Sequence, residues 1–230
     1  PTLLSLGNRD VHEIADSLRE LIHRTWKHEW GLEAISMASE MHARVALNEL
    51  LVAVDRTSQP LDSDHWNRVQ RCADSLWKRC DRQARQETIR RHLGGGEASL
   101  STKQWIMVLA AASAHASDVA RHAKSTEMLA AVLKRGRSAL NDPNATIDLR
   151  VRACRLIGCA MVPVSQQLED LRRTLGADQP GPVRRAGLAV AYRIPAAETA
   201  EVLLAAWDQL LPDERAMAGT TLLQRDAWTI

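Results

Sequence analysis

The sequence has very few aromatic residues. Its 230 residues include no Phe and a single Tyr, although seven Trp are present. The core must therefore consist mainly of Leu, Ala, Val, Ile and Met, a mixture that favours helices. Hydrophobic residues make up 45% of the chain, which is ordinary for a globular protein and argues against disorder.

Several functional motifs are also missing. The sequence contains no GxxxxGK[ST] or GxGxxG loop, no HExxH pair and no GxSxG elbow. The longest apolar run, residues 105–114, is too short to cross a bilayer. We therefore expect no catalytic residue, no cofactor, no bound metal and no membrane span in this segment, and we expect that the segment itself is not an enzyme.

The cysteines form neither a CxxC pair nor a CxxCH haem-attachment site. Cys72 and Cys80 are eight residues apart, Cys154 and Cys159 are five apart, and each pair is expected on one helix. A disulfide within one helix has poor geometry. We interpret all four as small buried side chains.

Histidines offer one metal-like pattern. His115, Asp118 and His122 would share a face of a continuous helix, and such a set can bind a metal. His23 and His28 form a second pair. Because histidines are common on exposed helix surfaces, we interpret both groups as surface side chains.

One stretch of the chain is strongly basic, although the net charge is only +2 and by itself predicts no polyanion partner. Residues 68–91 contain eight Lys or Arg and three Asp or Glu. A long helix is expected here, capped by Ser63 or Asp64 and running past residue 80. A basic helix face can bind phosphates, but long charged side chains also cover solvated faces routinely. We favour the solvated face, with four arginines on it as the candidate binding surface: Arg68, Arg71, Arg79 and Arg82.

An internal repeat is the strongest signal. Three segments align without gaps: residues 149–158, 183–192 and 214–223. Each has an arginine at its second position, spaced 34 and then 31 residues apart: Arg150, Arg184 and Arg215. Each arginine is followed three positions later by a small residue: Ala153, Gly187 and Ala218. We expect the arginines to bridge to carboxylates or loop carbonyls of adjacent repeats, and the small residues to allow close helix packing.

The repeat predicts an all-α fold, an α-α superhelix of HEAT-like helical repeats. Turn signals precede each aligned segment, and partner helices are expected at residues 165–175 and 196–211. A single helix pair cannot bury its own apolar face, so pairs stack on their neighbours. We expect irregular repeats in residues 1–93 and HEAT-like repeats in 97–230, with a hinge at Gly94–Gly96; one continuous solenoid is the alternative.

The aligned segments resemble a known family. Residues 148–158 and 178–187 resemble HEAT repeats. Residues 203–228 resemble a stretch of large bacterial membrane-bound dehydrogenase-like proteins, in which a β-propeller sugar-dehydrogenase-like domain, a HEAT-repeat region and a c-type cytochrome domain follow one another. The resemblance is clear over residues 125–228. The sequence begins at Pro1 without Met and ends directly after a predicted helix, so we expect it to be part of a longer polypeptide.

The resemblance implies a periplasmic or otherwise exported scaffold. Its partners would be the flanking domains of the same chain or another protein, and haem c would belong to the parent protein only. Two alternatives stay open: a nucleic-acid-binding HEAT-like protein that uses the basic 68–91 stretch, which we favour less, and a stand-alone protein-binding adaptor.

Overall fold

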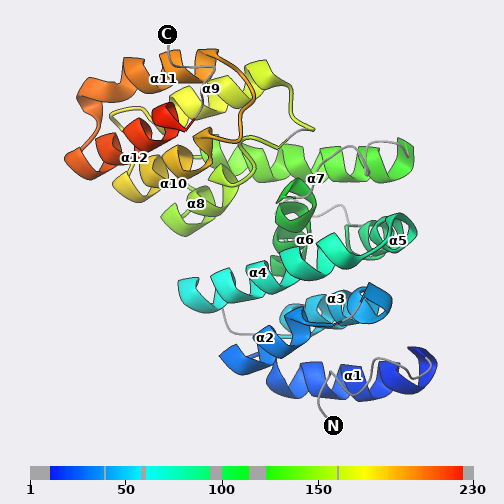
Figure 1. Ribbon diagram of the computed structural model, residues 1–230. Helices are drawn as coiled ribbons and strands as arrows, with labels where there is room; N and C mark the ends of the chain where they lie inside the picture. The colour runs from blue at the N-terminus through cyan, green and yellow to red at the C-terminus, as the bar shows by residue number, and fades with distance from the viewer. Residues whose placement is uncertain are drawn as a thin grey trace. The chain divides into compact units, whose positions relative to one another are not determined.

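Every regular element in the described part of the chain is a helix (Figure 1). This computed structural model describes residues 11–38, 40–57, 61–93, 100–113, 123–159 and 161–224. The helices in these ranges are α1 (Val11–Thr25), α2 (Glu29–Ser36), α3 (Glu40–Asp55), α4 (Ser63–Arg79), α5 (Arg82–His92), α6 (Thr102–Ser113), α7 (Ala123–Asn141), α8 (Ile147–Cys154), α9 (Val164–Thr174), α10 (Gly181–Ala191), α11 (Glu198–Ala206), the short 3-10 helix η2 (Trp207–Gln209) and α12 (Pro212–Leu223). None of these helices is both long enough and apolar enough to span a membrane.

The chain forms two compact units, residues 1–132 and 133–230, with the division inside α7. The sequence predicted a division at Gly94–Gly96, and those glycines lie outside the described residues. Helix α6, which follows them in the chain, packs on α3, α4 and α5 of the first unit.

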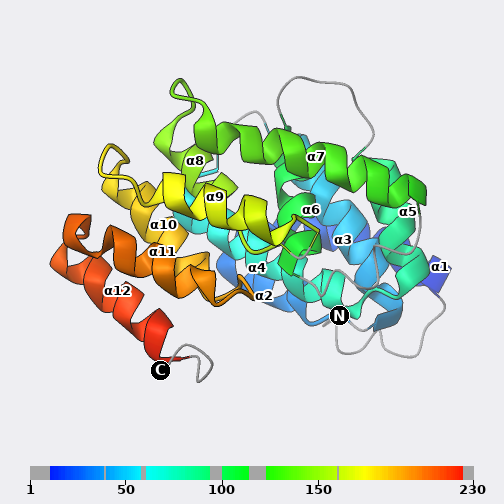
Figure 2. The same cartoon turned by 90° about the horizontal axis from the view of Figure 1, so that it is seen from above.

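Each unit has two layers of helices. In the first unit, α1, α3 and α5 form one layer and α2, α4 and α6 form the other (Figure 1). In the second unit, α8, α10 and α12 pack in sequence, while α9 and α11 lie side by side (Figure 2). Helices of successive pairs thus bury each other's apolar faces, which confirms the predicted all-α helical-repeat fold.

The basic stretch is two helices, so the single long helix predicted there is wrong. Cys80 is extended, with ψ of 136°, and interrupts the helix after Arg79. The Asp81 side chain accepts a hydrogen bond of 2.7 Å from the Ala84 amide and caps α5. The cap of α4 is Asp62, which accepts from the His65 amide at 2.7 Å, rather than Ser63 or Asp64. The apolar spacing continues past residue 80, but the capping hydrogen bonds end one helix there and begin another.

The prediction that the in-register arginines bridge to carboxylates or loop carbonyls of adjacent repeats is confirmed for Arg184, whereas the other two make different contacts. Arg184 Nε lies 3.0 Å from a carboxylate oxygen of Glu214 in the next helix pair, and Glu214 is completely buried. Arg215 donates to the carbonyls of Trp207 and Asp208, at 3.0 and 3.2 Å, where the preceding helix of its own pair ends. Arg150 donates to the side chain of Gln179, in the loop before α10.

The first unit contains an equivalent arginine that the sequence alignment missed. Arg85 donates to the carbonyls of Trp77 and Lys78 at 3.0 and 2.9 Å. These are the same contacts that Arg215 makes, and in both cases a Trp precedes the Arg by eight residues. That spacing was the available signal.

All four cysteines are buried and unpaired, as predicted. Burial raises the pKa of the Cys72 and Cys154 thiols to about 12 and that of Cys80 to about 11. These thiols are therefore protonated and unreactive at neutral pH.

The small residues of the repeat lie where helices approach closely. Ala153 and Ala218 are fully buried. A Cβ added to Gly187 would lie 2.5 Å from Thr174 Cγ2, well inside van der Waals contact. A side chain at this position must therefore displace α9 from α10 or force a strained rotamer.

We expect Gly187→Ala to destabilise the chain by about 1–3 kcal/mol, because it overpacks the α9–α10 contact. Thr174→Ser removes the clashing methyl group and keeps the hydroxyl that donates to the Asp170 carbonyl. Chemical denaturation should therefore show less destabilisation by Gly187→Ala in the Thr174→Ser background than in the original chain. Equal loss in both backgrounds would show that the glycine matters for another reason.

Candidate functional site

A groove of about 300 Å³ lies between α2 and α4 in the first unit. Glu29 and Glu33 line it from α2, while Arg68 and Arg71 line it from α4. The remaining lining residues are the mostly buried Leu32, Ser36, Cys72 and Ser75. The groove thus has an acidic wall facing a basic wall.

Helical spacing explains why these side chains share one opening. Each helix contributes four residues at positions i, i+3, i+4 and i+7, which lie on one side of a helix. The neighbouring apolar stripes are fully buried, with Ile35 on α2 and Val69, Ala73 and Leu76 on α4. Burial of those stripes fixes the rotation of both helices and turns the charged sides toward the groove.

Both ends of the groove are closed by polar contacts. Arg68 Nη1 lies 3.3 Å from a carboxylate oxygen of Glu29. At the other end, Arg79 Nη1 donates to the carbonyls of Ser36 and Ala38, at 2.5 and 2.8 Å. These carbonyls belong to the turn between α2 and α3, so Arg79 holds that turn against α4.

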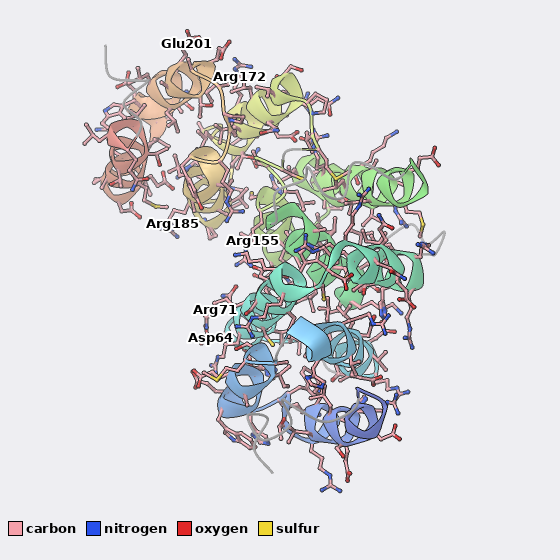
Figure 3. All side chains as sticks on the ribbon, turned by 45° about the vertical axis from the view of Figure 1, so that its right-hand side comes forward. Asp64, Arg71, Arg155, Arg172, Arg185 and Glu201 are labelled. Atoms are coloured by element: carbon pink, nitrogen blue, oxygen red, sulfur yellow. The ribbon has the colours of Figure 1, made fainter. Side chains whose placement is uncertain are left out.

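The centre of the groove keeps one acid and one base without ion-pair partners. Glu33 and Arg71 are both exposed, and neither forms an ion pair with the other or with another described residue. Arg71 is labelled on α4 in Figure 3, together with Asp64 near the start of the same helix. Glu33 and Arg71 can therefore each form an ion pair with an oppositely charged group of another molecule.

Two large apolar side chains are exposed beside this groove. Trp30 is 60% exposed and Met37 is 66% exposed. Trp30 and Glu33 stand three residues apart on α2, and Met37, the C-cap residue of that helix, follows Glu33 by four, so this spacing places the three on one side. The His28 ring stacks on Trp30, with centroids 6.0 Å apart and planes 7° from parallel. We call Trp30, Glu33, Met37 and Arg71 the α2–α4 surface.

The structure brings together only part of the predicted arginine surface. Arg68 and Arg71 line the groove, whereas Arg79 donates hydrogen bonds to backbone carbonyls of the α2–α3 turn. Arg82 begins α5, a different helix, and has an interaction of its own.

The α2 half of the site was not predicted from the sequence. The structure buries Ala38 and exposes Met37. The separation of α2 from α3 decides this, and the apolar spacing in the sequence left it open.

The site offers binding groups and no reactive set. Cys72 lines the groove, but burial raises the pKa of its thiol to about 12. Within the described ranges, no three His, Cys, Asp or Glu side chains are grouped to hold a metal. His23 contacts Glu49 at 3.4 Å. The candidate set of His115, Asp118 and His122 lies outside the described residues.

Comparisons with protein-family models, with curated proteins and with solved structures find no match to this chain. The resemblance to the HEAT region of dehydrogenase-like proteins therefore stays a prediction.

The two arginines at this site should respond differently to truncation. Arg79→Ala removes a charged donor from two carbonyls, so we expect a loss of about 1–2 kcal/mol of unfolding free energy. Arg71→Ala removes no hydrogen bond or ion pair with a described residue, so its effect should stay within about 0.5 kcal/mol. Denaturation of both variants measures the contrast. Equal destabilisation would contradict the assignment of Arg71 as a free binding group.

Proposed function

We propose that this chain is a non-catalytic helical-repeat scaffold that binds another protein through the α2–α4 surface. One observation carries the proposal: Trp30 on α2 and Met37 at its C-cap are exposed on the side that also carries Glu33, across the groove from Arg71. Trp, Met and Arg are enriched in protein interfaces, and buried aromatic and Arg anchors dominate their energetics. Scattered exposed apolar residues are ordinary, but these lie beside two unpaired charges.

The surface specifies the chemistry of its partner. A partner segment would place an apolar side chain against Trp30 and Met37, an acidic group at Arg71 and a basic group at Glu33. Opposite charges on the two walls would also fix the direction in which the segment lies.

A nucleic-acid partner has weaker support. Phosphates approaching Arg71 would also meet the carboxylates of Glu29 and Glu33. Arg68 is already paired with Glu29, and Arg79 is bound to main-chain carbonyls. Repulsion by the acidic wall therefore offsets much of the attraction that a basic face would supply.

A charge-swap experiment tests the proposed surface. Peptides selected from a displayed library against the whole chain should include a class with an acidic residue next to an apolar one. Binding of that class should weaken at least about tenfold with Arg71→Glu, because the acidic residue then meets a like charge. Changing that acidic residue of the peptide to Lys should restore binding to the Arg71→Glu variant.

The matched control is Leu204→Ala, which removes an exposed apolar side chain from α11 in the other unit. It should leave binding unchanged, whereas Trp30→Ala should abolish it. The proposal fails if the selected peptides bind all these variants equally.

The finer proposal is that this segment joins a dehydrogenase domain to a cytochrome domain in one longer polypeptide. Its support is the sequence resemblance. The intact mass and visible spectrum of the native polypeptide test it. A mass far above 25.5 kDa with a c-type haem band is expected, whereas a mass near that value without colour would favour a stand-alone adaptor.

A further inference from the structure

The second unit contains one repeat arginine that lacks the acid its equivalent possesses. In the repeat alignment, Glu214 directly precedes Arg215, and it neutralises Arg184 of the previous pair. The residue in the same position for Arg150 is Val183, which directly precedes Arg184 and is buried. Arg150 therefore lacks the carboxylate partner that Arg184 has, and no other described residue supplies one.

The three guanidinium nitrogens of Arg150 differ in their hydrogen bonds. Nη2 donates to the side-chain oxygen of Gln179. Nε is buried and has no hydrogen-bond partner. Nη1 has no partner among the described residues, and it is not among the buried unsatisfied atoms, so it reaches solvent. The solvent-facing Nη1 is therefore free to donate charge-assisted hydrogen bonds to an anion.

An opening of about 570 Å³ lies against this guanidinium. Arg173 and Asn141 line it and add a second positive charge and an amide donor. Asp178 also lines it, but its carboxylate accepts from the Gln179 amide at 3.2 Å rather than pairing with Arg150. That contact turns the Gln179 oxygen toward Arg150. Arg173 pairs with Glu169 at 2.9 Å on an exposed surface, where such pairs contribute little and exchange readily.

We infer that the Arg150 pocket binds a carboxylate of a partner chain, which supplies from outside the acid that Glu214 supplies to Arg184 from inside. The carboxylate can come from an acidic side chain or from a chain end. This inference shares with the proposed function only the class of partner, a protein. It involves the other unit and none of the residues of the α2–α4 surface.

Titration of the whole chain with capped peptides tests the inference directly. An acetylated and amidated Ala-Ala-Asp-Ala-Ala peptide carries only a side-chain carboxylate, and acetylated penta-alanine carries only a terminal one. The doubly capped penta-alanine carries neither, and inorganic phosphate provides a different anion. The readout is the ¹H–¹⁵N signal of Arg150 Nε, assigned by its loss in Arg150→Gln. We expect one or both carboxylate peptides to shift it and the doubly capped peptide to leave it unchanged.

Two variants locate the binding. Gln179→Glu keeps the shape and the hydrogen bond to Arg150 but supplies a carboxylate within the chain. It should fold normally and weaken peptide binding at least about tenfold, since it occupies and neutralises the guanidinium. Arg150→Gln lacks the reporting signal, so its peptide affinity is measured by isothermal titration calorimetry, and that affinity should fall similarly. The matched control is Arg172→Gln, which removes the same charge from an exposed neighbouring position outside the pocket (Figure 3).

The competing outcomes are distinct. A side-chain or a terminal carboxylate is identified by which peptide shifts the signal, and either supports the inference. No shift with either carboxylate peptide overturns it, as does an equal shift with the doubly capped peptide. A shift with phosphate alone also overturns it. Failure of the α2–α4 charge swap would leave this result unaffected, because the titration reads Arg150 itself.

Discussion

A guanidinium at the start of the second helix of a pair is the contact on which this fold depends. The last carbonyls of any helix have no partner within that helix. Arg85 and Arg215 each donate to two such carbonyls of the preceding helix, and so they fix the turn between the two helices. Arg184 also reaches a fully buried Glu214 in the next pair. Loss of either member of that pair would leave a buried charge uncompensated, which makes the contact between successive pairs specific.

Other arginines of the chain have different roles. Arg79 uses its donors on the α2–α3 turn, and this contact closes one end of the groove. Arg71, two turns earlier on α4, forms no hydrogen bond or ion pair with any residue that the structure describes. Arg150 is clamped by Gln179 yet keeps free nitrogens, because Val183 stands where Glu214 stands in the next repeat. Position relative to a neighbouring helix end decides between a structural and a binding role.

Both proposed binding surfaces follow from one property of stacked helix pairs. Each pair is held by its neighbours through buried aliphatic stripes and arginine contacts, so its outward side is free to vary. An exposed residue on that side, such as Trp30, leaves the buried stripes between pairs intact. Scaffolds of this kind can therefore acquire a binding group in a single repeat without disturbing the rest.

The sequence by itself determined the helical class, the three aligned helices of the second unit, the burial of the cysteines and the structural role of the repeat arginines. These features depend on local spacing, since an apolar stripe and an arginine in register have few alternative uses. The tertiary structure decided the rest. Capping by Asp81 divided the basic helix, and packing against α4 separated the roles of Arg71 and Arg79. The acidic half of the groove comes from α2, which lies some 40 residues away in the chain. Whether a charge is neutralised depends on which helix packs beside it. The residue spacing along one helix does not predict that contact.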